Sequence, residues 1–413
     1  MTLRPIVALL ACVLIAGTSD AQIHVSGTVV DSATGDPLPY ATVSLVGKAI
    51  GTITNTDGSF DLHISQTNPS DTLMISMIGY ARQKMSVNTP IVGQTIRLKQ
   101  QAFQLDEVVV VSVDEIFKKI KARVENNYPV DNYYMESFYR EIKKYNDEYK
   151  SLLEAAVVIE DKGYNHLKTG EDAFVREIRG SSKFVNVYAD FWQTNNLLRE
   201  TLGLNAVRHP TSVPSVYGKF PYKLRGTTKL FDRPVYILAS DTAHNEGWLR
   251  TIYVDTETYA IYRSEEQVVR RSVTWKVDNR DSVHERIIKG ISVFDFRPVN
   301  GKLYLNYIRH EVEAEYYNPS TKKIYDRFTS INELVVTDVH RDTKAVKLLS
   351  PIKNIALEQQ VTPYNEKFWA NYNAIRKTPL ELEVMKDLTK GTSLQEQFIQ
   401  SGTGTQSTKK KRR

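Results

Sequence analysis

Alternating apolar and polar residues predict short strands across residues 22–100 of the chain. In "YATVSLVG" the residues Ala41, Val43 and Leu45 fall on one face, as strand geometry requires of every second residue. About seven such runs follow one another, separated by Gly- and Pro-containing turns. This spacing is typical of a small sandwich, so we expect two antiparallel sheets packed over one core.

The run "TNTDGSFDLHI" carries the strongest turn signal in this region. Asp57-Gly58 predicts a hairpin, because glycine takes positive φ at low cost. Phe60 and Leu62 then alternate onto one face of the next strand.

A helix is expected within residues 101–130, which link the sandwich to the rest of the chain. Ser112 and Glu115 form a capping box, in which each side chain satisfies a backbone donor of the other residue. An apolar stripe repeats every four residues, at Ile116, Ile120 and Val124. Pro129 ends the pattern. We interpret this helix as a hinge between modules or a lid on the next one.

Strands dominate again over residues 131–345. In "SVTWKVD" the apolar residues Val273, Trp275 and Val277 share one face, and "VDTETYAI" reads as two strands around a polar turn. Sequential hairpins of this kind predict an antiparallel, strongly curved sheet resembling a half-barrel. Arg, Glu and Lys interrupt both faces, which argues against the continuous apolar band of a membrane barrel.

Helices are expected over residues 346–400. Phe368, Tyr372 and Ile375 form one stripe, and "TPLE", from Thr378 to Glu381, forms a second capping box.

Residues 401–413 combine a Gly/Ser/Thr spacer with "KKKRR". This tail predicts a solvated, disordered end, with docking on an acidic surface as the alternative. It lacks the aromatic residues that accompany basic ones in nucleic-acid binding, so no nucleic-acid partner is expected.

Residues 1–21 have the pattern of a signal peptide, with Arg4 before an apolar run and small residues before Gln22. The run is shorter than the roughly 20 residues that a membrane helix needs, so we expect an exported protein without a transmembrane helix. Lipid attachment at Cys12, within "LLAC", is the alternative. Cleavage before Gln22 removes Cys12, the single cysteine, and would exclude disulfides and thiolate chemistry.

Four motifs in order, "GTVVDSATGDPLPYATVSLVG", "GTITNTDGSFDLHI", "DTLMISMIGY" and "TIRLK", resemble the carboxypeptidase-like regulatory domain. The resemblance implies a transthyretin-like sandwich with a non-catalytic role in assembly or recognition. It also implies that Gly58 is a turn residue and that Gly79-Tyr80 closes a core strand.

A zinc carboxypeptidase would need a His-x-x-Glu pair, and only His310 is followed by Glu at that spacing, Glu313. The surrounding sequence reads as a strand, in which residues three apart point to opposite faces. We therefore interpret His310 as a sheet histidine beside Ile308 and Val312. No hydrolase or nucleotide-binding motif is found, and we assign no catalytic, cofactor-binding or metal-ligating residue and no cofactor.

The segment "FQLDEVVVVS" resembles the piece that follows the same module in TonB-dependent receptors. There, a Val-rich strand can pair with an energy-coupling partner, which here would involve Val108, Val109, Val110 and Val111. A last strand or linker of the sandwich is the alternative. The remaining residues do not read as a plug followed by a large barrel.

The stretches "NYYMESFYREIKKYNDEYKSLLEAAVVI", "YKLRGTTKLFDRPVYIL", "IYVDTETYAIYR" and "EKFWANYNAIRKTPLE" resemble exported proteins that join this module to an uncharacterised β-rich domain. The hairpin around Asp255 also resembles those of periplasmic lipoprotein-carrier half-barrels, as a fold-level analogy.

These observations predict a mainly β, non-enzymatic protein of the periplasm or outer membrane that binds a partner or an apolar ligand. The 23 tyrosines suit ligand walls and ordinary sheet packing equally well. Two alternatives stay open. One is an envelope hydrolase with an unrecognised carboxylate site, and the other is an accessory of a TonB-dependent transporter.

Overall fold

The computed structural model describes residues 23–64, 70–87, 91–101, 111–165, 171–182, 195–205, 207–208, 221–240, 248–268, 274–276, 283–342, 344, 346–375, 379–389 and 392–402. The expected signal peptide with Cys12, the valines Val108 to Val110 and the basic tail beyond residue 402 lie outside these ranges. The described chain is mainly β, as the sequence predicts.

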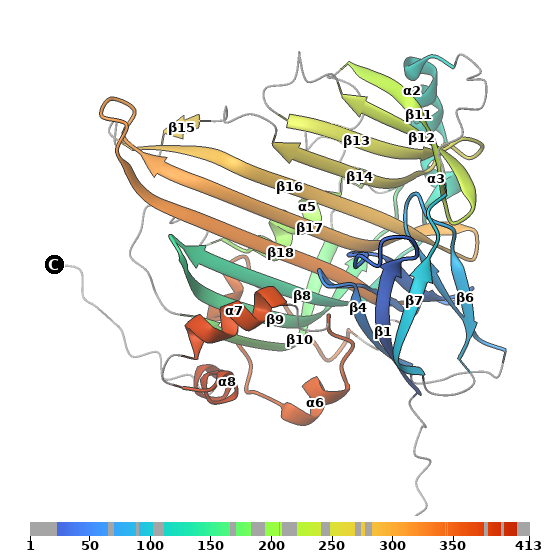
Figure 1. The fold of residues 1–413 in the computed structure, drawn as a ribbon. Helices are drawn as coiled ribbons and strands as arrows, with labels where there is room; N and C mark the ends of the chain where they lie inside the picture. Colours follow the sequence, from blue (N-terminus) through green and yellow to red (C-terminus); the bar gives the residue numbers. More distant parts are fainter. Residues whose placement is uncertain are drawn as a thin grey trace, which may run out of the picture.

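The N-terminal module is a sandwich of seven strands in two sheets (Figure 1). Its strands are β1 Ile23–Asp31, β2 Thr42–Leu45, β3 Gly51–Ile53, β4 Ser59–Ile64, β5 Thr72–Ser76, β6 Gln83–Ser86 and β7 Ile91–Leu98. One sheet has the order β4-β1-β7 and the other β3-β2-β5-β6. Ala41, Val43, Leu45, Phe60 and Leu62 are buried together between the sheets, as their alternation predicts.

Two sequence expectations for this module are wrong. Strands β1 and β7 pair in parallel, so one sheet is mixed and not antiparallel. The Asp57-Gly58 turn does not form a hairpin, because β3 pairs with β2 while β4 pairs with β1. The turn crosses from one sheet to the other. Gly58 has φ +76°, and a Cβ there would lie 2.5 Å from the carbonyl oxygen of Val29, so only glycine fits.

Helix α2, Val113–Ala122, begins as predicted, since the Ser112 hydroxyl accepts a hydrogen bond from the backbone amide of Glu115 at 3.2 Å. The chain breaks at Arg123 and continues as the short helix α3, Val124–Asn127, which ends before Pro129. Ile116 and Ile120 are buried against the large sheet.

The middle of the chain forms one twelve-stranded sheet within the described residues. Along the main path its order is β11-β12-β13-β14-β16-β17-β18-β8-β9-β10-β19, and β15 pairs beside β16. The strands are β8 Tyr133–Tyr145, β9 Glu148–Asp161, β10 Glu171–Ser182, β11 Tyr222–Leu230, β12 Arg233–Ser240, β13 Trp248–Asp255, β14 Ile261–Val268, β15 Thr274–Lys276, β16 His284–Val299, β17 Lys302–Tyr317, β18 Ile324–His340 and β19 Ser350–Pro351.

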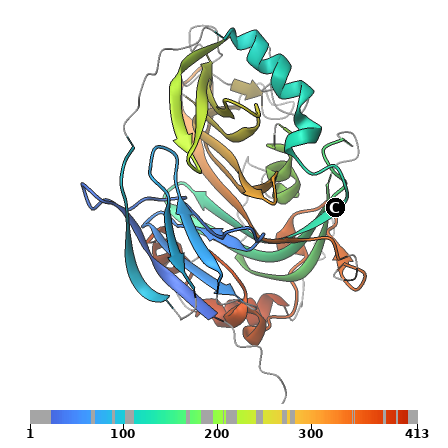
Figure 2. The same ribbon diagram turned by 90° about the vertical axis from the view of Figure 1, so that its right-hand side faces the viewer.

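All neighbouring strands in this sheet are antiparallel, and the sheet is strongly curved (Figure 2). Both properties agree with the sequence prediction. The predicted turn in "VDTETYAI" joins β13 to β14. Of "SVTWKVD", the structure describes only Thr274–Lys276, which form β15.

Different elements cover the two faces of the sheet (Figures 1 and 2). The concave face packs against α2 and against helix α5, Leu197–Gly203, whose Leu198 and Leu202 are buried there. A short 3₁₀ helix η2, Leu357–Gln359, also packs on this side through Leu357. The N-terminal module and the C-terminal helices lie on the convex face.

The C-terminal helices are α6 Glu366–Asn371, α7 Pro379–Leu388 and α8 Leu394–Gly402. Helix α6 is shorter than the predicted stripe, because the chain becomes extended at Tyr372. Tyr372 and Ile375 therefore pack on the sheet from an irregular segment, together with Trp369. Helix α7 begins at Pro379, and Thr378 lies outside the described residues.

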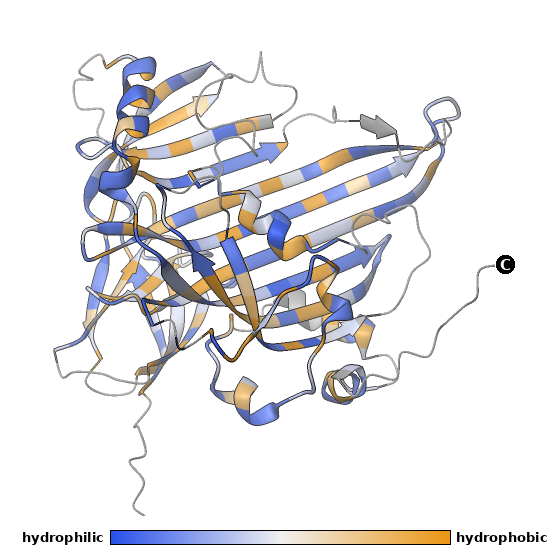
Figure 3. Ribbon diagram, turned by 180° about the vertical axis from the view of Figure 1, so that it is seen from behind, coloured by the Kyte–Doolittle hydropathy of each residue, from blue (hydrophilic) through white to orange (hydrophobic). Residues whose placement is uncertain are grey.

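Hydrophilic and hydrophobic residues are interspersed along the strands of the large sheet (Figure 3). Charged residues of the sheet pair across neighbouring strands. On the convex face, Glu154 of β9 binds Arg140 of β8 and Arg179 of β10. Arg309 of β17 binds Glu333 of β18 in the same way. Many of these charged residues lie buried between the sheet and its covering elements.

Candidate functional site

A cavity of about 140 Å³ lies between the N-terminal module and the convex face of the sheet. The module contributes Pro39, Tyr40, Thr42, Ser76, Met77 and Ile78, and the sheet with its β11–β12 turn contributes Leu230, Phe231, Arg263, Glu265, Asp295 and Phe296. The site is therefore assembled only when the module is docked. Its walls combine apolar rings with a few charged groups, which is common in ligand-binding pockets.

The module can dock because one of its sheets has a polar outer face. Thr42, Ser44 and Ser76 alternate with the core residues of β2 and β5 and so point away from the sandwich core, yet all three are buried. Asn306 of β17 donates a hydrogen bond to the Thr42 hydroxyl at 3.2 Å and another to Asp295 at 3.2 Å. The large sheet thus supplies polar partners for this outer face.

Arg263 joins the two acidic residues of the cavity. Its Nε donates to Glu265 Oε1 at 2.6 Å, and its Nη1 donates to Asp295 Oδ2 at 3.5 Å. Burial raises the pKa of Asp295 to about 6, although the positive charge of Arg263 acts in the opposite direction. Asp295 can therefore exchange a proton near neutral pH, while the guanidinium provides a fixed positive charge.

Tyr40, which lines the cavity from the module, packs on the large sheet. Its backbone has φ 63°, which is uncommon for a residue other than glycine, and its ring stacks on Tyr307. The guanidinium of Arg309 lies 5.5 Å from the Tyr40 ring centroid and also donates to Glu333 at 2.5 Å. Burial raises the pKa of Tyr40 to about 12, so the phenol stays neutral. These contacts hold the Tyr40 side chain in place beside the cavity.

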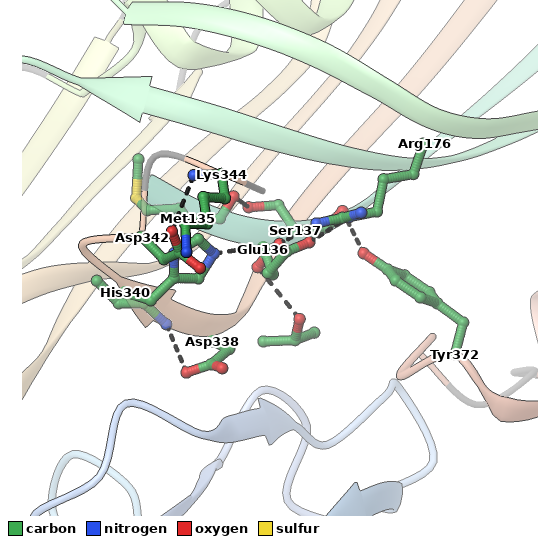
Figure 4. Close-up of polar contacts among 11 residues, drawn as sticks. Met135, Glu136, Ser137, Arg176, Asp338, His340, Asp342, Lys344 and Tyr372 are labelled. Atoms are coloured by element: carbon green, nitrogen blue, oxygen red, sulfur yellow. Dashed lines mark hydrogen bonds and ion pairs between the residues drawn. The ribbon is translucent and has the colours of Figure 1, made fainter. Parts of the chain in front are cut away.

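A second polar cluster lies farther along the convex face (Figure 4). Arg176 of β10 donates two hydrogen bonds to Glu136 of β8, at 2.7 and 2.5 Å, and His340 Nε2 lies 3.2 Å from the same carboxylate. Tyr372 donates to the backbone oxygen of Ser137 at 2.9 Å. Burial opposes ionisation of Glu136, but the hydrogen bonds from His340 and Arg176 outweigh it and lower its pKa. The cluster binds the C-terminal segment to three strands.

A third charged group is enclosed on the concave face. Lys143 lies 2.7 Å from Glu141 and also pairs with Glu358, which precedes Gln359 at the end of η2. Burial and the charge of Glu358 raise the pKa of Glu141 to about 7. Tyr139 donates to Glu141 at 2.9 Å, so this group is a buried network that fixes η2 on the sheet.

The residues that the sequence singled out are not brought into one site. His310 lies in β17 with Nδ1 2.9 Å from the Ser292 hydroxyl, and burial lowers its pKa to about 4. Glu313, three residues later in the same strand, lies on the opposite face, where Glu311 pairs with Arg309. Val111 packs on the core of the large sheet, and the other three valines of its run are outside the described residues.

Sequence reasoning missed the residues that meet at the cavity. Tyr40 and Asp295 are far apart in the chain, and only the docking of the module brings them together. It also missed His24, Asp61 and His63, which converge on the outer face of β1 and β4. The Asp-x-His spacing in "FDLHI" was an available signal, because it places both side chains on one face of a strand.

Comparisons with known proteins concern mainly the N-terminal module. Residues 25–110 match the CarboxypepD_reg-like domain family. The TonB-dependent receptor SusC of Bacteroides thetaiotaomicron is 39% identical over 98 residues, which cover 24% of this chain. The match spans only 9% of the receptor's own length.

Solved structures give weaker similarities. A LolA superfamily protein of Nitrosomonas europaea aligns with 56% of this chain and 95% of its own, at 13% identity and a TM-score of 0.19. The MucA/MucB complex of Pseudomonas aeruginosa aligns with 55% of this chain, and 99% of that chain is covered, at 11% identity and a TM-score of 0.19. TM-scores of this size do not establish a shared fold.

None of the helices within the described residues has both the length and the apolar composition needed to cross a lipid bilayer. From the sequence comparisons, the N-terminal module is similar to the CarboxypepD_reg-like domain and to part of a TonB-dependent receptor.

Proposed function

We propose that this protein is a non-enzymatic binding protein of the cell envelope. In this proposal the large sheet holds the N-terminal module in a fixed orientation, and the module binds an envelope protein. The envelope location rests on the similarity of the module to part of the TonB-dependent receptor SusC. It agrees with the leader expected over residues 1–21.

One observation carries this proposal: the module is buried on one side and exposed on the other. Thr42, Ser44 and Ser76 are buried against the large sheet. Strands β6 and β7 are the last strands of their two sheets and pair with no further strand among the described ones (Figure 1). A sheet edge of this kind offers backbone groups to an added strand.

The charge of this edge indicates the partner's chemistry. Lys84 on β6, Arg97 on β7 and Lys99 just after β7 are exposed, and Val92 of β7 is 64% exposed. We therefore expect an extended segment with acidic side chains and an apolar anchor, since opposite charges favour association. The similarity of the module to part of SusC supports proteins of TonB-dependent transport as the first candidates to test.

Three carboxylates of the convex face outside the cavity, Glu154, Glu311 and Glu315, suit a structural role. Arg179 and Arg140 overcome the effect of burial and lower the pKa of Glu154 to about 2. The pKa of Glu311 and that of Glu315 are also lowered, because their basic neighbours outweigh burial. A general acid near neutral pH needs the opposite shift. These carboxylates suit ion pairs that hold the sheet and its cover together.

Co-purification from envelope fractions tests this proposal. The tagged full-length protein should retain one envelope protein in stoichiometric amount, identified by mass spectrometry. A charge-reversal variant at the edge, Arg97→Glu with Lys99→Glu, should lose it, whereas Lys347→Glu, an exposed change outside the module, should keep it. Equal recovery with both variants would refute the proposed edge. Deletion of Val108–Val111 tests separately whether the valine run takes part.

The hydrolase alternative is favoured by one observation, the two carboxylates of the cavity. Burial raises the pKa of Asp295 to about 6, and Arg263 donates hydrogen bonds to both Asp295 and Glu265. If this site is catalytic, a panel of chromogenic glycosides and esters should include a substrate whose hydrolysis both Asp295→Asn and Glu265→Gln abolish. Absence of turnover in the wild type, or turnover that survives both changes, would exclude this alternative.

A further inference from the structure

Three potential metal ligands meet on the outer face of the N-terminal module. In the register of β1 and β4, His24 lies directly opposite His63, and Asp61 is two residues before His63. Cross-strand partners and residues two apart share one face of a sheet. The neighbours Val25 and Leu62 point into the sandwich core, so the three side chains point outward.

Their polar atoms converge on one point. His24 Nε2 lies 2.9 Å from Asp61 Oδ1, and His63 Nε2 lies 3.2 Å from the same oxygen. The two imidazole rings stack with centroids 4.7 Å apart and planes 11° apart. One ligand atom from each residue can be chosen so that all three lie within 4.8 Å of one another. All three side chains are partly exposed, so an ion can reach them from solvent.

We propose that His24, Asp61 and His63 bind one divalent transition-metal ion of the zinc class. Two imidazoles and a carboxylate are ordinary zinc ligands, at bond lengths of about 2.0–2.2 Å. Tetrahedral geometry at these lengths requires ligand atoms roughly 3.3 Å apart, so the observed separations need only small side-chain movements. When Nε2 binds the ion, each imidazole would carry its proton on Nδ1, any second proton would leave to solvent, and water would take the fourth position.

The backbone around the site is held in place from outside the module. The side chain of Asn373 accepts a hydrogen bond from the His63 amide at 2.7 Å and donates one to the His63 carbonyl oxygen at 3.0 Å. It occupies the outer edge of β4 as a neighbouring strand would. The ligand-bearing strand is thus fixed to the C-terminal segment, and metal binding would strengthen this joint. A metal ion favours such pre-positioned ligands.

The alternative is a hydrogen-bonded His–Asp–His surface group that binds no metal, and metal titration separates the two. Zn²⁺ would be titrated into the metal-free full-length protein in competition with a chromophoric chelator, and Co²⁺ binding would be followed by its visible absorption. We expect one ion per chain. His24→Ala, Asp61→Asn and His63→Ala should each weaken Zn²⁺ binding by at least about tenfold.

His284→Ala serves as the matched control, because His284 lies on β16 outside this group. It should bind Zn²⁺ as the wild type does. Circular dichroism without metal checks that each variant folds, and His24→Ala, the most exposed of the three ligands, keeps the test valid if the β4 variants do not fold. Wild-type affinity in all three ligand variants, or no binding above that of a triple variant, would overturn the proposal. This outcome is independent of the partner proposed above.

Discussion

The ring of Tyr40 stacks on the ring of Tyr307, with centroids 5.6 Å apart and planes 19° apart. Tyr40 belongs to the N-terminal module and Tyr307 to strand β17 of the large sheet. The contact therefore joins the module to the large sheet, and it lies beside the cavity, which Tyr40 lines. Because Tyr40 holds a positive φ, the surrounding contacts must fix its position.

Removal of the Tyr40 ring should loosen the docking of the module. We expect Tyr40→Ala to cost about 2 kcal/mol, from lost burial and lost aromatic stacking. Hydrogen exchange in β2, whose Thr42 is buried in the contact, should become faster. Tyr40→Phe keeps the ring and should stay within about 0.5 kcal/mol of the wild type. Unchanged exchange in Tyr40→Ala would show that the stacking does not hold the module.

Gly51 of the module lies against the side chain of Arg297 from the large sheet. A Cβ there would lie 2.1 Å from Arg297 Nη1 and 2.8 Å from the carbonyl oxygen of Val43. Arg297 is buried and also donates to the backbone oxygen of Ala49, so it has little room to move. We expect Gly51→Ala to destabilise the protein by about 1–3 kcal/mol in thermal unfolding.

Gly203→Ala is the matched control for this change. Nothing lies within 4 Å of a Cβ at this last residue of α5. Alanine is a better helix former, so the variant should be neutral or slightly more stable. A loss of stability at Gly203 equal to that at Gly51 would mean that the close approach to Arg297 is not the cause.

Glu154 should make folding stability depend on pH in the acid range. Its pKa is about 2 in the folded protein and about 4.5 in an unfolded chain, because Arg179 and Arg140 outweigh burial. Its contribution is therefore complete above about pH 4.5 and is lost as the pH falls toward 2. Glu154→Gln should cost about 3 kcal/mol at pH 7, since it removes the carboxylate that pairs with the buried Arg140 and the partly buried Arg179.

The same variant should flatten the decline of melting temperature between pH 4.5 and 2. Glu125→Gln, at an exposed position of α3, should follow the wild-type curve. If Glu154→Gln and the wild type decline in parallel over this range, the ion pairs do not lower the pKa of Glu154.

The sequence predicted what local periodicity determines. Alternation at Ala41, Val43 and Leu45 identified one core face of the module, and the Ser112 capping box located the start of α2. The parallel pairing of β1 with β7 was missed because alternation does not reveal a strand's neighbour. The Asp57-Gly58 signal correctly located a turn, but a turn does not specify which sheets its strands join.

The cavity could not be predicted from the sequence, for a different reason. Thr42 and Ser44 look like the solvent-facing half of an alternating strand, and only the partners on the large sheet make their burial possible. Asp295 has no motif around it, and its raised pKa comes from burial that the docking and the sheet create together. Such sites depend on tertiary contacts and not on local sequence.

The central claim is that the fixed module presents its free edge to an envelope partner, and site-specific photo-crosslinking tests it most directly. A photoreactive residue at Val92, on edge strand β7, should yield one adduct of defined mass in intact cells. The same residue at Leu348, which is 95% exposed outside the module, should yield none. No adduct at Val92, or the same adducts at both positions, would contradict the account.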